Sequence, residues 1–162
     1  MSEDRYLIRA GEIAAMEGLA KTHFLNTKAR RTNKSLGDAT GLKGLGFHII
    51  EVEPGFETTE FHRHHHEDEA VFVLSGTATA RLGEERVEIG PGDFIGYRAD
   101  GAAHGIENTG TEVLRLIVVG QRLPHDVADY PDRGKRIFRN AGMSWQLVDI
   151  DAIEEVQAGA KQ

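Results

Sequence analysis

Four histidines stand within five positions near the middle of the chain, at His62, His64, His65 and His66. Three acidic residues follow them directly and end at Glu69. Imidazole and carboxylate groups are ligands that zinc, iron, manganese, nickel and copper accept in proteins. A histidine run in a polar loop is also commonly just solvent-exposed. Residue type alone therefore leaves a metal site and an exposed loop both open.

The spacing within this cluster favours the metal site. Alternate residues of an extended strand face the same side, so His62 and His64 can present their rings to one point while His65 faces away. Glu69 begins an apolar stretch in which it alternates in phase with two valines. A carboxylate buried beside valines is costly unless it has a partner, and a metal cation would supply one.

The chain around these residues predicts a succession of short strands. Seven runs between residues 45 and 120 are separated by turns rich in glycine, proline and asparagine. The expected strands are Phe47–Glu53, Ala70–Leu74, Thr77–Leu82, Arg86–Ile89, Asp93–Tyr97, Ala103–Glu107 and Glu112–Val119. No long helical stretch separates them, which argues against a parallel α/β sheet. We therefore predict an all-β fold, a sandwich or a closed barrel.

The flanking segments carry weaker signals. A helix is expected over Glu12–Ala20, and the basic run Lys28–Lys34 is interpreted as a solvated arm or loop. Further along, Asp126–Asp132 is expected to be a connecting loop that stops at a proline. Two strand candidates follow it, at Arg136–Phe138 and Ser144–Ile150.

The composition narrows the class of protein. The chain has 162 residues, of which 40% are apolar and 28% charged, as expected for one globular domain with its own core. Cysteine is absent, which excludes disulfides, thiolate metal sites and cysteine nucleophiles. The net charge of −7 argues against nucleic acid or an anionic membrane as a partner. The start of the sequence has no signal-peptide pattern, so we expect a cytoplasmic protein.

Two motifs in the central segment resemble those of the cupin superfamily. The first runs from Gly55 through His62, His64 and Glu69 to Gly76, with one residue more than usual after its first glycine. The second comprises Gly101, His104 and Asn108, with an alanine where the family commonly has a proline before the Asp-Gly pair. The tail over residues 126–135 is similar to that of a group of small bacterial cupins.

The resemblance implies a small β-barrel, or double-stranded jelly roll, with a short N-terminal arm and minor helices. Residues 1–44 would pack on the barrel as that arm, and residues 45–120 would form the barrel core. Residues 121–162 would then supply the C-terminal strands and tail of the same single domain. Because cupins are commonly homodimers, a homodimer is expected.

The resemblance also implies one divalent metal ion per chain. Its implied ligands are His62, His64, Glu69 and His104. Zinc, iron, manganese and nickel all accept this ligand set, so the metal is left open. Four protein ligands on a metal that prefers six leave about two positions free for substrate. The sequence identifies no catalytic base and no organic cofactor site.

Three functions are compatible with such a site, all with a small molecule as the partner. The leading one is a sugar or sugar-phosphate isomerase, in which the metal polarises a hydroxyl–carbonyl pair. Phosphate would then need local positive charge, for which the candidates are Arg63, Arg81, Arg98 and Arg115. The alternatives are an iron dioxygenase and a non-enzymatic cupin that binds a small molecule. A helix-turn-helix segment is not expected, because residues 1–44 are too short and too poorly patterned for one.

Overall fold

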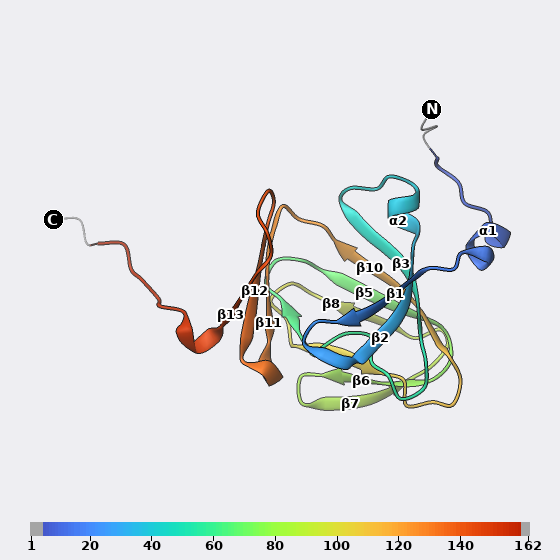
Figure 1. Ribbon diagram of the computed structural model, residues 1–162. Helices are drawn as coiled ribbons and strands as arrows, with labels where there is room; N and C mark the ends of the chain where they lie inside the picture. Colours follow the sequence, from blue (N-terminus) through green and yellow to red (C-terminus); the bar gives the residue numbers. More distant parts are fainter. Residues whose placement is uncertain (1–4, 160–162) are drawn as a thin grey trace.

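The computed structural model describes residues 5–159, and it consists mostly of β-strands (Figure 1). Its helices are α1 (Ala10–Ala15), α2 (Leu36–Ala39) and two 3-10 turns, η1 (Pro131–Arg133) and η2 (Ile150–Ala152). The prediction of an all-β fold with minor helices is confirmed. Among the described residues, no helix has the length and apolar character needed to cross a membrane.

The strands form three antiparallel sheets. The strands are β1 (Leu19–His23), β2 (Asn26–Ser35), β3 (Leu45–Val52), β4 (Arg63–His64), β5 (Glu69–Ser75), β6 (Ala78–Leu82), β7 (Glu85–Ile89), β8 (Phe94–Tyr97), β9 (His104–Glu107), β10 (Leu114–Gln121), β11 (His125–Tyr130), β12 (Lys135–Asn140) and β13 (Gln146–Asp149). The largest sheet has the order β1-β2-β3-β10-β5-β8, and the smaller ones have the orders β13-β12-β11-β4 and β7-β6-β9.

The main core lies between the largest sheet and the three-stranded sheet. Ile50, Val73 and Leu116 of the largest sheet are buried in one cluster with Ala80 and Ile106 of the smaller one. The alternation along each strand sends these side chains inward and their neighbours outward. This shared core holds together the two sheets that carry Glu69 and His104.

The middle of the largest sheet places Glu69 as the alternation predicts. β10 pairs with β3 on one side and with β5 on the other, and β5 pairs in turn with β8. On β5, Val71 and Val73 are buried while Phe72 between them is 40% exposed. Glu69 shares the inward face of these two valines and is the first residue of the strand.

The N-terminal segment differs from its prediction. The helix ends at Ala15, and Leu19–His23 forms strand β1 instead of the end of a helix. The basic run is not a loop but part of β2, which pairs with β1 and with β3. Ala29 and Asn33 of this strand are buried, whereas Arg30 is exposed. A strand with one inward and one solvated face accommodates the basic run, because alternate cations can remain in water.

The acidic stretch near the C-terminus is also a strand, contrary to the prediction of a loop. His125–Tyr130 forms β11, which pairs with β12 along its whole length and with the short β4. Asp126 and Asp129 are buried in it, and Arg139 and Arg136 of β12 pair with them. Acidic residues disfavour a buried strand only while they are unpaired, and here the neighbouring strand supplies the cations.

Candidate metal centre

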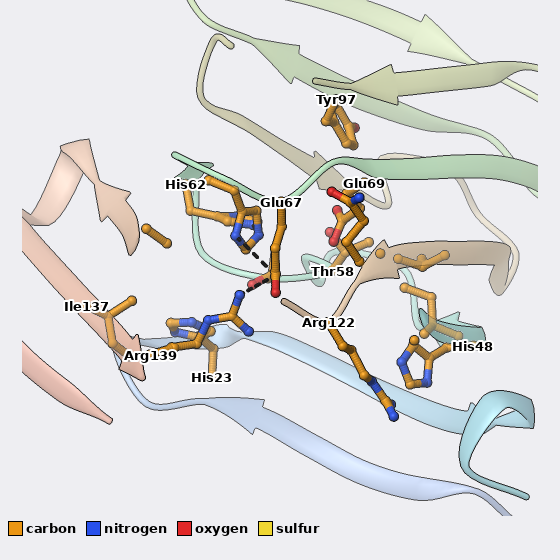
Figure 2. A pocket seen from close by; sticks show the side chains of 18 of the residues that line it. His23, His48, Thr58, His62, Glu67, Glu69, Tyr97, Arg122, Ile137 and Arg139 are labelled. Atoms are coloured by element: carbon orange, nitrogen blue, oxygen red, sulfur yellow. Dashed lines mark hydrogen bonds and ion pairs between the residues drawn. The ribbon is translucent and has the colours of Figure 1, made fainter. Parts of the chain in front are cut away.

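A cavity of about 740 Å³ opens among the three sheets and contains the residues singled out from the sequence. All four of the implied ligands, His62, His64, Glu69 and His104, line its wall. Figure 2 shows His62 and Glu69 in this cavity, with Tyr97 close to Glu69. The four residues lie up to about forty positions apart in the sequence, so the fold must bring them together.

Backbone pairing brings the histidines of the two motifs into contact. The His62 N–H donates to the His104 carbonyl at 3.0 Å, and the His104 N–H donates back to the His62 carbonyl at 2.7 Å. Their ring centroids are 4.6 Å apart as a result. His64 lies two positions on, in β4, opposite Ala128 of β11. Glu69 begins β5, where it pairs with Tyr97 of β8.

The donor atoms of these side chains converge. The Nε2 atoms of His62 and His64 are 3.1 Å apart. The distance from Glu69 Oε1 to His104 Nε2 is 3.7 Å. One donor atom from each of His62, Glu69 and His104 lies within 4.8 Å of the other two. The structure therefore brings His62, Glu69 and His104 together at one point in the cavity wall, and His64 adjoins this group through His62.

The hydrogen bonds of the Nδ1 atoms of His62 and His64 determine which ring nitrogen faces the other proposed ligands. His62 Nδ1 lies 2.8 Å from the Glu60 carbonyl oxygen, and His64 Nδ1 lies 2.6 Å from a carboxylate oxygen of Asp126. Both oxygens are acceptors, so each Nδ1 carries the hydrogen. In the neutral rings, both Nε2 atoms then present lone pairs to each other across 3.1 Å. Two facing lone pairs repel, and a cation between them would remove the repulsion.

The burial and ionisation of the proposed ligands also suit a cation. His104 Nε2 is buried and has no hydrogen-bond partner in the described part of the chain. Burial, with a contribution from His104, lowers the pKa of His62 to about 3, so this imidazole is neutral at pH 7. Burial would raise the pKa of Glu69, but His104 and His62 outweigh it and bring this pKa to about 2. A metal ion requires neutral imidazole and ionised carboxylate ligands, and His62 and Glu69 are in those states, so the residues fit the implied group.

A second group of possible metal donors adjoins the first, but an arginine already occupies the place of a cation. Donor atoms of His64, Glu67 and Asp126 lie within 4.8 Å of one another. Arg139 donates to both carboxylates, and its pairing with Glu67 is drawn in Figure 2. Glu67 also accepts the N–H of Leu123 at 2.9 Å. Both acids share one arginine in this network, and Asp126 holds the His64 ring.

Sequence reasoning missed this supporting network. Asp126 was assigned to a loop, and nothing local connects it with His64, because the contact depends on the pairing of β11 with β4. The other two histidines of the run lie outside the centre. His65 contacts Asp129, with Nε2 2.9 Å from its carboxylate, and His66 is exposed.

Comparisons with known proteins agree with the motifs. A family model described as the cupin domain matches residues 48–120. The structure of a candidate sugar phosphate isomerase from Acidithiobacillus ferrooxidans is 51% identical, covers 94% of this chain and 97% of its own, and superposes with a TM-score of 0.91. A sugar phosphate isomerase of the cupin superfamily from Silicibacter pomeroyi is 26% identical, covers 88% and 94% of the two chains, and has a TM-score of 0.78. No curated protein matches the sequence. Together with the β-fold and both motifs, these relationships show that the chain belongs to the cupin superfamily.

Proposed function

We propose that this cupin is a metal-dependent isomerase of small sugar phosphates, with one divalent ion held by His62, His64, Glu69 and His104. The observation that carries the proposal is the convergence of His62, Glu69 and His104 in the wall of a cavity, with His64 Nε2 3.1 Å from His62 Nε2. The substrate class is supported by the likeness to the candidate sugar phosphate isomerase, which extends over nearly the whole chain. The cavity volume lies within the range of roughly 300–1,000 Å³ typical of small-molecule sites.

The proposed chemistry divides between the ion and the chain. A divalent ion bound at these donors would polarise a hydroxyl–carbonyl pair of an open-chain sugar and acidify the carbon-bound proton between the oxygens. The chain keeps His62 neutral and Glu69 ionised, and it orients the rings of His64 and His104. Tyr97 packs flat on the His104 ring, with 3.5 Å between the ring centroids, and Asp126 holds the outer nitrogen of His64. Ligands held in this way need little reorganisation to bind the ion.

The test is an isomerisation assay on untagged protein loaded in turn with zinc, manganese, nickel and iron(II). Ribose 5-phosphate and glucose 6-phosphate are incubated with the protein in deuterated water, and ketose formation and deuterium incorporation are followed by NMR. We expect isomerisation with at least one metal, together with deuterium at the carbon that exchanges its proton. Neither ketose nor deuterium incorporation with any of the metals would contradict the proposal.

A matched pair of histidine variants tests the role of the centre. His64→Ala removes a proposed ligand, whereas His66→Ala makes the same change at an exposed residue two positions away. We expect His64→Ala to lose bound metal and activity together, and His66→Ala to keep both. Equal activity in the two variants would show that the reaction does not depend on this centre.

A further inference from the structure

Two basic side chains of the cavity wall have no acidic partner among the described residues. Four lysine and arginine residues line the cavity: Lys21, Arg31, Arg122 and Arg139. Arg122 and Arg139 each form an ion pair with a carboxylate of the same wall. Lys21 and Arg31 form no ion pair with any carboxylate of residues 5–159. In a chain that carries a net charge of −7, two unpaired cations in one cavity call for an explanation.

These two cations face each other across a strand pair. Lys21 of β1 is the direct register partner of Arg31 of β2, so both side chains lie on the same face of the sheet. Like charges directly opposite each other on antiparallel strands are destabilising. Lys21 is exposed at the cavity wall, and Arg31 is partly buried. An anion bound between them would turn their repulsion into two attractive interactions.

Arg31 is connected through Thr58 to the strand that carries a proposed metal ligand. Its Nη1 donates to the Thr58 carbonyl, and the Thr58 N–H donates to Ile106 of β9 at 2.9 Å. β9 begins at His104. The Nε of Arg31 is buried and has no hydrogen-bond partner, so this donor is not used within the described part of the chain. Burial lowers the pKa of Arg31, and the Glu69 carboxylate partly offsets this.

We propose that Lys21 and Arg31 bind the phosphate group of the substrate, while its hydroxyl–carbonyl end lies at the metal centre. The inference rests on the proposed isomerase function and adds the binding site for the anionic end of the substrate. Arginine offers a planar fork of N–H donors to a phosphate, and lysine offers a mobile ammonium group. A phosphate dianion would balance the two unpaired charges and engage the free Nε donor.

This site replaces the arginines suggested by the sequence. None of Arg63, Arg81, Arg98 and Arg115 lines the cavity of the metal centre. Arg81 pairs with Asp132 on the outside of the barrel. Arg63 and Arg115 also pair with carboxylates. Of the two residues that do reach the cavity, Arg31 lies in the basic run interpreted as a solvated arm or loop, and Lys21 lies before that run.

Calorimetric titration of chelator-treated, metal-free protein tests the proposal without relying on the activity of the loaded enzyme. The ligands are inorganic phosphate, ribose 5-phosphate and ribose. We expect both phosphates to bind and ribose not to bind. Arg31→Gln and Lys21→Gln should each weaken phosphate binding about tenfold or more, as expected for the loss of one charge-assisted contact. Added salt should weaken the binding to wild type.

Arg30→Gln is the matched control. Arg30 is the neighbouring residue of the same strand and carries the same charge, but it is exposed, is not part of the cavity wall, and lies over the Phe56 ring. We expect its phosphate affinity to equal that of wild type. Unchanged affinity in both Arg31→Gln and Lys21→Gln, an equal loss in Arg30→Gln, or no phosphate binding to wild type would each overturn the inference. If Arg31→Gln does not fold, the exposed Lys21 variant decides alone.

The outcomes separate this inference from the proposed function. Phosphate binding that depends on Lys21 and Arg31, without isomerisation of any sugar phosphate, would support the anion site and contradict the isomerase. Isomerisation of sugar phosphates with the same KM in wild type, Lys21→Gln and Arg31→Gln would support the isomerase and overturn the anion site.

Discussion

Replacing Asp126 with asparagine removes the charge that holds His64 while preserving the shape of the side chain. Asp126 is 1% exposed. One of its carboxylate oxygens accepts from His64 Nδ1 at 2.6 Å and from Arg139 at 2.5 Å, and the other accepts from the backbone N–H of His66 at 3.1 Å. An asparagine has one acceptor and one donor end. In either orientation of the amide, its NH₂ group must face a donor that the carboxylate satisfied.

Two effects of different kind follow from this mismatch. The buried donor left without an acceptor should lower the free energy of unfolding by about 1–3 kcal/mol. The His64 ring also loses the carboxylate that determines its tautomer and orientation. Losses of such outer partners commonly weaken metal binding about 10- to 100-fold. We therefore expect the zinc Kd of Asp126→Asn to rise by a factor in that range.

The assay is a competition titration of zinc against a chromophoric chelator, with urea unfolding of the same metal-free samples. Asp129→Asn is the matched control, because it makes the same change at a buried position of the same strand. Asp129 binds Arg136 and His65, and among the described residues it forms no hydrogen bond or ion pair with any of the four proposed ligands. Both variants should lose stability, but only Asp126→Asn should bind zinc more weakly. A zinc Kd equal to that of wild type, or the same increase in both variants, would refute the reasoning.

Three further predictions concern stability, each measured by urea unfolding. Gly76→Ala should lower the free energy of unfolding by about 1–3 kcal/mol, because φ is 84° there and a Cβ would lie 2.9 Å from backbone atoms of the facing strand; an unchanged midpoint would contradict this. Arg139→Met should cost about 3 kcal/mol or more by removing the cation that two buried carboxylates share, and a stable variant would show that these acids do not need the cation. Burial raises the pKa of Asp129, but Arg136 and His65 bring it to about 2, below the unfolded value of about 3.9. Its contribution of roughly 2–3 kcal/mol is thus present above about pH 4 and lost as the pH falls toward 2. The stability difference between wild type and Asp129→Asn should accordingly shrink between pH 6 and pH 3, and a constant difference would contradict the sign.

The proposed ligands were accessible from the sequence because their relations are local or belong to recognisable motifs. The period of two places His62 and His64 on one side and Glu69 in phase with the valines of β5, and the structure shows this arrangement. The positive φ of Gly76 likewise matches a glycine of the first motif. Such features depend on a few neighbouring residues, so a pattern in the sequence can reveal them.

The supporting residues could not be predicted, because their roles come from strand pairing over long distances. Asp126 reaches His64 only because β11 pairs with β4, across about 60 residues of sequence. Arg31 lines the cavity because β2 joins the largest sheet through β3. In both segments the composition predicts exposed residues, because acidic and basic runs are usually solvated. Neither run reveals which oppositely charged residues the neighbouring strand will supply.

The central claim is that four side chains of this chain hold one metal ion, and elemental mass spectrometry tests it most directly. The protein should be untagged, purified without an immobilised-metal column and compared with His64→Ala and Glu69→Ala. We predict about one metal ion per wild-type chain and a loss of most of it in both variants, whose circular dichroism should remain that of the folded β-protein. Wild type without metal after incubation with each ion, or full occupancy in both variants, would contradict the claim.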